Sequence, residues 1–216
     1  MCGSLLEKNW IMENLAINSS APSQTGKDKV SEAYQEISLF FQPGDLEYFR
    51  VDLWQWLRAV TCEKPFSFRG EPSTVVALQK QLTKIILASR LMLDVAQTLG
   101  EDLSCSNFQP FSEAQIANDR QYMREIKELT AKYGGTIRRL TLSEAERPIL
   151  AIQRFFNAHS LEEWSEILDE WVEYGLSKMS ICEATGESAQ VFQYELFECL
   201  LEATHLIISR RTANAV

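Results

Sequence analysis

Two segments of the chain carry the same pattern of residues at a constant offset of 115 positions. They are residues 40–57 and 155–172, in which Phe-Phe, Leu-Glu, Leu and Trp are identical at matched places. Amphipathic helices align with one another because they share one apolar spacing. That spacing requires neither the Phe-Phe pair nor the matched tryptophans Trp56 and Trp171. The sequence therefore predicts an internal duplication of a helical unit.

The spacing of the apolar residues predicts an all-α fold, because intervals of three and four recur in every long segment. Together with the duplication, it indicates a six- to eight-helix bundle built from two tandem pseudo-symmetric repeats. We expect residues 1–26 to form an N-terminal helix and linker. Residues 27–111 would form the first repeat and residues 112–216 the second, packed as one compact domain. The expected helices are 4–17, 28–41, 46–61, 73–99, 112–133, 143–158, 160–174 and 188–211.

Polar residues mark where several of these helices begin. Asp45 precedes the helix at 46–61 and is a typical N-cap residue. Ser160 with Glu163 has the spacing of a capping box, in which each residue satisfies the backbone of the other. Ser143 with Glu146 has the same spacing. We therefore expect capping boxes at the starts of the helices at 160–174 and 143–158.

Charge and composition narrow the classes of partner. The formal net charge is −9, and no cluster of Lys and Arg is long enough to follow a phosphate backbone, so nucleic acid is a disfavoured partner. No apolar run reaches the length of a membrane span. Hydrophobic residues make up 45% of the chain, which is typical of a globular protein with a sizeable core.

Five cysteines, an odd number without a CxxC pair, argue against a disulfide framework. Leu5 and Leu6 are followed at once by Glu7 and Lys8, so the first residues lack the apolar core of a secretory signal. These features predict a reduced, cytoplasmic protein. Met12 is an alternative start that the sequence does not distinguish from Met1.

Trp54 is an unmatched aromatic residue within the duplicated pattern. Trp56 and Trp171 match each other, which predicts that both belong to the core, whereas the position equivalent to Trp54 is Asp169. Trp54 also lies off the apolar stripe of its helix. It either packs beneath the N-terminal helix or a loop, or anchors a partner, since aromatic residues dominate interface hot spots.

Arg154 and His159 form an Arg-x4-His pattern at the end of the helix predicted at 143–158. The pattern is similar to the helical motif of the HEPN family of ribonucleases. In that family the arginine and the histidine act on RNA across a dimer interface. The resemblance covers these two positions and implies a catalytic role for both. The alternative is a surface arginine beside a helix C-terminal histidine that the helix dipole favours.

Glu195, Glu198, Glu202 and His205 lie on one face of the last predicted helix, and Glu202 with His205 forms an ExxH motif. A ferritin-like di-metal site requires two such motifs and two further carboxylates on facing helices. The other histidine of the chain, His159, lacks a matching glutamate. Glu198, Glu202 and His205 are therefore candidate metal ligands, and the alternative is a solvated helix face.

The sequence on its own favours a non-catalytic module for protein interaction or self-association, without a cofactor. The alternatives are a HEPN-like ribonuclease that uses Arg154 and His159, and a carboxylate-bridged metal protein that uses Glu202 and His205. The expected partner is another protein or a second copy of the chain, with neither nucleic acid nor membrane involved. Trp54 is the candidate residue for partner binding.

Overall fold

The computed structural model describes residues 26–42, 45–61, 72–98, 127–177, 179–185 and 189–214, and every regular element in these ranges is a helix. None of the described helices is both long enough and apolar enough to cross a membrane. Residues 127–133 are also helical. The labelled helices are α2 (Gly26–Phe40), α3 (Leu46–Thr61), α4 (Pro72–Thr98), α6 (Leu142–Glu146), α7 (Ile149–Ala158), α8 (Leu161–Leu176), α9 (Ile181–Thr185) and α10 (Gln190–Asn214).

The caps of α3 and α8 explain why both helices begin where the sequence predicts. The backbone N–H of Tyr48 donates to the Asp45 carboxylate at 2.9 Å. At α8, the hydroxyl of Ser160 accepts from the N–H of Glu163, and the carboxylate of Glu163 accepts from the N–H of Ser160. These bonds satisfy backbone donors that have no partner within the helix. The capping box predicted at Ser160 is confirmed.

The single helix predicted at 143–158 is wrong, because the chain breaks it into α6 and α7 at Pro148. Proline disfavours helical geometry at the residue before it, and Arg147 adopts φ −125° and ψ 80°. The capping box also lies two residues earlier than predicted. It joins Thr141 to Glu144, because the side chain of Thr141 accepts from the N–H of Glu144.

Some predicted elements lie outside the described residues or were missed. The helix at 4–17, nearly all of the segment 1–26 and the first part of the helix at 112–133 lie outside the described ranges. The helical residues 127–133 end at Gly134 and Gly135, which have φ of 61° and 78°. Glycine adopts positive φ without steric cost, so this pair turns the chain sharply towards α6. The short helix α9 was not predicted.

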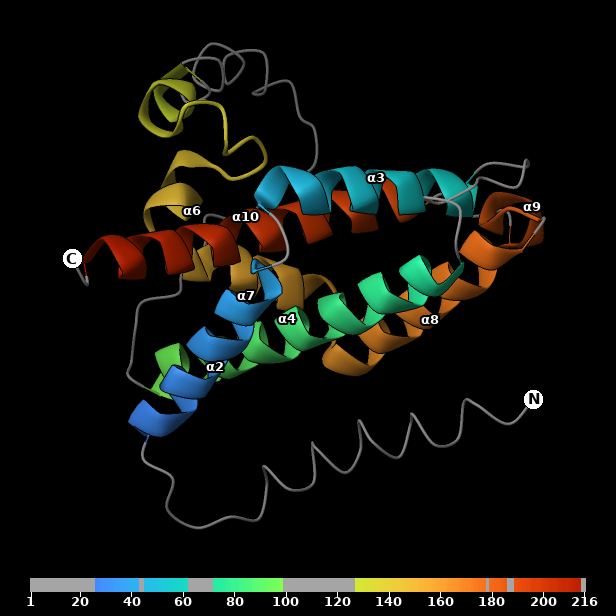
Figure 1. Cartoon of the computed structure of the whole chain (residues 1–216). Coiled ribbons are helices and arrows are strands. Elements are labelled where there is room, and N and C mark those ends of the chain that lie inside the picture. The colour runs from blue at the N-terminus through green and yellow to red at the C-terminus, as the bar shows by residue number, and fades with distance from the viewer. Residues whose placement is uncertain are drawn as a thin grey trace.

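The helices α3 and α8 connect the N-terminal and C-terminal halves of the chain (Figure 1). α3 contacts α8, and each of these two helices also contacts a long helix from the other half of the chain. α3 lies along α10, while α8 lies along α4. Within each half, α4 packs against α2 and α10 packs against α7. The two long helices therefore hold both halves in one core.

Trp56 and Trp171 meet at the centre of this core. Both are fully buried, and their rings are 5.6 Å apart and almost perpendicular. The indole N–H of Trp56 donates to the carbonyl of Trp171 at 2.9 Å, and the indole N–H of Trp171 donates to the side-chain oxygen of Gln193 at 2.9 Å. The prediction that both tryptophans belong to the core is confirmed.

Stacked aromatic pairs lie at the connection between α2 and α3 and at the connection between α7 and α8. Phe40 stacks on Phe49 with ring centroids 4.1 Å apart, and Phe155 stacks on Trp164 at the same separation. In each pair, the first ring lies in the last turn of one helix and the second lies in the first turn of the next. Stacking of this kind stabilises the contact between the two helices beyond the effect of apolar burial alone.

Candidate functional site

Charged residues are buried where α3 packs against α10. Arg50 on α3 is only 4% exposed, and its guanidinium donates to the carboxylate of Glu202, which is fully buried on α10. The same guanidinium also contacts Glu47 and lies 3.8 Å from Glu198. Buried charges are costly unless they are paired and hydrogen-bonded. The Arg50–Glu202 pair joins residues far apart in the sequence and meets this requirement in part, because the buried Nε of Arg50 has no hydrogen-bond partner among the described residues.

Glu202 also binds the backbone that follows Gly135. Its two carboxylate oxygens accept the N–H groups of Arg138, Arg139 and Leu140 at 2.8, 2.9 and 3.2 Å. Burial raises the pKa of Glu202, while these backbone bonds and Arg50 oppose that rise. The carboxylate therefore attaches the segment at 138–140 to α10, and its hydrogen-bonding capacity is used within the molecule.

Arg139 extends the cluster towards the surface. Its guanidinium donates to Glu198 at 2.6 Å and to Glu195 at 3.3 Å. Burial alone would lower the pKa of Arg139, but the bond to Glu198 and the nearby carboxylates raise it. Burial and the charge of Glu198 raise the pKa of Tyr194 in the adjoining turn. Arg139 is therefore a charged structural partner of α10.

The candidate metal ligands Glu198, Glu202 and His205 lie at this cluster but do not converge. Glu198 and Glu202 both face Arg50, whereas the ring of His205 packs edge-on against Phe41 at 5.3 Å. Burial lowers the pKa of His205, and the charge of Arg50 lowers it further. Among the described residues, no group of three or more His, Cys, Asp or Glu side chains is placed to hold a metal ion. The metal site stays a prediction.

Arg154 and His159 make contacts with different neighbours. The guanidinium of Arg154 lies 2.8 Å from the Glu144 carboxylate and donates to the sulfur of Cys199 at 3.0 Å. His159 follows the last residue of α7, and its ring packs edge-on against Trp164 at 4.7 Å. Burial raises the pKa of the Cys199 thiol to about 12, so this cysteine is not a thiolate at neutral pH. The ribonuclease role of Arg154 and His159 stays a prediction.

Trp54 lies on the outer face of α3. Its side chain is 50% exposed, and its ring packs edge-to-face against Tyr194 of α10 at 5.7 Å. Val51, one turn earlier on α3, is 47% exposed. Val191 and Phe192, in the first turn of α10, are each more than half exposed. Trp54 is thus a large apolar side chain that is held on one side and open on the other.

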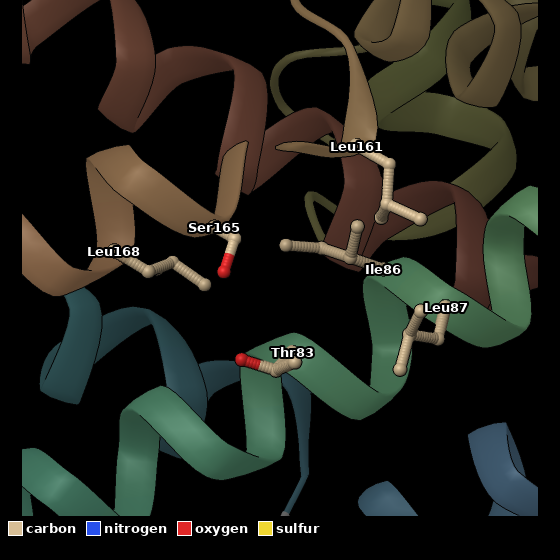
Figure 2. Close-up of a pocket in the computed structure, with 6 residues that line it drawn as sticks. All are labelled: Thr83, Ile86, Leu87, Leu161, Ser165 and Leu168. Atoms are coloured by element: carbon tan, nitrogen blue, oxygen red, sulfur yellow. The ribbon is translucent and has the colours of Figure 1, made fainter. Parts of the chain in front are cut away.

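A small hollow separates α4 from α8 (Figure 2). Its volume is about 20 Å³, which is room for about one water molecule. The hydroxyls of Ser165 and Thr83 face it from opposite helices, and the rest of the lining is aliphatic. Ser165 stands 115 positions after Arg50, which is the offset at which the two sequence segments align. The lining residues of the hollow are Thr83, Ile86, Leu87, Leu161, Ser165 and Leu168.

Sequence reasoning did not single out Arg50 or the cradle of backbone N–H groups around Glu202. One signal was present, because Arg50 falls on the inner side of α3 between Leu46 and Leu53, where an apolar residue is expected. The N–H groups around Glu202 belong to the backbone, so their arrangement depends on the fold and not on residue types that the sequence pattern could reveal.

Comparison with known proteins leaves the chain without an assigned relative: no protein-family model, curated protein or solved structure matches it.

Proposed function

We propose that this protein is a non-catalytic helical module that binds another protein, or a second copy of itself, through the outer face of α3 centred on Trp54. The observation that carries the proposal is the position of Trp54, whose ring is held by Tyr194 while half of its surface faces solvent. A tryptophan that is ordered before binding loses little conformational entropy in a complex. Such residues supply a large share of the binding energy at protein interfaces.

The charged residues inside the molecule support a structural role for the cluster at α3 and α10. Arg50, Glu198 and Glu202 face one another and the segment at 138–140. A cluster that binds a substrate would direct some of these groups into an open cavity. This arrangement favours a binding function on the surface over chemistry in the interior.

We further infer that the two halves of the chain are diverged copies of one helical unit. Three matched features support the duplication: the stacked pairs before α3 and α8, the central tryptophans, and the exchange of long helices between the halves. α2, α3 and α4 would correspond to α7, α8 and α10. Within this correspondence, Trp54 is an addition to one copy, which indicates a role outside the shared core.

The chemistry of the chain also limits the proposed partner and location. The net charge of −9 disfavours a polyanion such as nucleic acid, so a protein is the proposed partner. The cysteine pattern favours the reducing cytoplasm, and the described Cys182 and Cys199 are both free thiols. We propose a cytoplasmic protein partner on these grounds.

The test compares Trp54→Ala with Leu39→Ala. Leu39 on α2 is a matched control because it is 43% exposed and lies outside the α3 face. The sedimentation mass of the protein and its capture of other proteins from a cell extract are measured for both variants and for the wild type. We expect Trp54→Ala to weaken association at least thirtyfold, on the order of 2 kcal/mol, and Leu39→Ala to leave it unchanged. Equal association by both variants would contradict the proposal.

A further inference from the structure

Four exposed residues form one outer stripe on α3: Glu47, Val51, Trp54 and Arg58. Their spacing of four, three and four residues places them on one side of the helix, as the a and d positions of a heptad are placed. We call this set the α3 stripe. Trp54 and Val51 are its apolar centre, and its two ends carry opposite charges.

The equivalent stripe on α8 has a different composition. The residues 115 positions later are all acidic and all exposed, and they are Glu162, Glu166, Asp169 and Glu173. Asp169 accepts a hydrogen bond from Gln79 of α4 at 2.6 Å, whereas the Trp54 ring contacts Tyr194 of α10, so a polar residue can make the contact with the long helix as well as an apolar one. The apolar centre of the α3 stripe therefore calls for an explanation outside the folding of the single chain.

The α3 stripe is complementary to itself when it is reversed. In an antiparallel pair of identical helices related by a two-fold axis between residues 52 and 53, position 47 lies opposite position 58, and position 51 lies opposite position 54. We propose that α3 packs against α3 of a second copy of this chain in this way. Val51 would pack against the partner's Trp54, and Glu47 would pair with the partner's Arg58. The proposal rests on the proposed function and names the second copy as the partner.

The charges support this occupant. An isologous interface brings the same patch together twice, so both ion pairs form at once. A pair of α8 stripes would bring eight carboxylates together, and like charges at an interface are unfavourable. The net charge of the chain is −9, so most of its surface repels a second copy. The α3 stripe carries one acidic and one basic residue, and it therefore avoids the repulsion that two α8 stripes would have.

The surroundings of the stripe fix two of its members before the copies meet. Trp54 is held by Tyr194, and Glu47 by Arg50 and by Arg138 at 2.9 Å. Side chains that are already ordered pay less entropy on association. An interface built on one short helix pair is small, so we expect a reversible dimer with a Kd on the order of 10 µM.

The first experiment measures mass against concentration by sedimentation equilibrium. We expect the wild type to approach twice the chain mass of 24.7 kDa. Trp54→Ala should raise the dimer Kd at least thirtyfold, and Arg58→Glu should raise it about tenfold because both ion pairs become repulsive. Arg211→Glu makes the same charge change near the C-terminal end of α10, outside the α3 stripe, and should leave the dimer Kd unchanged.

The second experiment tests the antiparallel register. In the Arg58→Lys variant, a carbodiimide can join the new amine to the Glu47 carboxylate as an amide, with the lost water taken up by the reagent. Positions 47 and 58 are about 16 Å apart along one helix, so this bond cannot form within a chain. We expect the 47–58 cross-linked peptide in the dimer band. A dimer without that peptide would overturn the antiparallel pairing.

The outcomes separate this inference from the proposed function. A wild type that stays monomeric, but captures a different protein in a Trp54-dependent way, would overturn the dimer and leave the proposed function standing. A dimer that is insensitive to Trp54→Ala and Arg58→Glu would overturn the inference. If capture were also unaffected by Trp54→Ala, the proposed function would fall as well.

Discussion

α3 and α8 pack against each other and each contacts one long helix, yet the two differ on both of their faces. Each is capped by a polar residue, carries a fully buried tryptophan and packs against a long helix from the other half. On the inner face, Arg50 of α3 stands where α8 has Ser165. On the outer face, Trp54 stands where α8 has Asp169. The matched tryptophans are buried in the core, whereas the two differing positions change the charge and polarity of each helix.

The difference between Arg50 and Ser165 gives two kinds of helix junction, one where α3 packs against α10 and one where α8 packs against α4. Between α3 and α10, a buried guanidinium and a buried carboxylate pair with each other and with the backbone at 138–140. Between α4 and α8, small hydroxyl residues leave a hollow of about 20 Å³. The charged junction costs desolvation energy but positions the chain between the helical residues 127–133 and α6.

The largest expected effect comes from placing valine at each of the two inner positions. Arg50→Val leaves the Glu202 carboxylate buried without its guanidinium, so we expect a loss of about 3–5 kcal/mol in the free energy of unfolding. Ser165→Val fills the hollow, and we expect a stability within about 1 kcal/mol of the wild type. Urea denaturation measures both variants. Similar losses in the two would remove the distinction between the junctions.

The central tryptophans provide a test in which the two halves should behave alike. Trp56→Phe removes the bond to the Trp171 carbonyl, and Trp171→Phe removes the bond to Gln193. Each should cost about 2 kcal/mol, since a buried acceptor loses its donor and a small void is left. Because the two rings are in contact, the double variant should depart from the sum. Additive losses in thermal unfolding would show that the rings are uncoupled.

The smallest effect concerns pH and the charged junction. The pKa of His205 is lowered below its ordinary value of 6.5, so the folded protein binds this proton less tightly than the unfolded chain. Stability from His205 is therefore present above pH 6.5 and is lost as the pH falls through the lowered pKa. The pKa of Glu202 is raised, so the stability that depends on its titration is lost as the pH rises through that raised pKa.

His205→Phe isolates the histidine from Glu202, because the variant keeps Glu202 and the ring contact with Phe41. Relative to this variant, the wild type should lose stability on going from pH 7 towards pH 5, as measured by chemical denaturation at each pH. A constant difference between the two proteins across this range would contradict the lowered pKa.

Much of the helical framework could be predicted from local patterns. α3 has the predicted bounds 46–61, and the Asp45 cap and the Ser160 capping box follow from spacing and residue type. The break at Pro148 could not be judged from apolar spacing, because the stripe continues through it. The conformation of Arg147 and the position of the cap decide where the chain turns.

The charged cluster could not be predicted, for a different reason. Arg50 and Glu202 are 152 positions apart, and the partners of Glu202 include backbone groups that any sequence would supply. The place of Trp54 off the apolar stripe could be predicted, because it is a local property of α3, whereas its contact with Tyr194 of α10 could not. Local patterns indicate which face a residue occupies, whereas long-range pairing decides what it contacts there.

The most direct test of the account gives α3 the outer residues of α8. The variant Val51→Glu/Trp54→Asp carries the acidic residues of Glu166 and Asp169 on the α3 stripe. Its sedimentation mass should stay that of the monomer at every concentration where the wild type associates. Its free energy of unfolding should fall by no more than about 2 kcal/mol, because Val51 is exposed and Trp54 loses one ring contact, with Tyr194. A folded variant that associates as strongly as the wild type would contradict the claim that α3 differs from α8 in order to bind a protein.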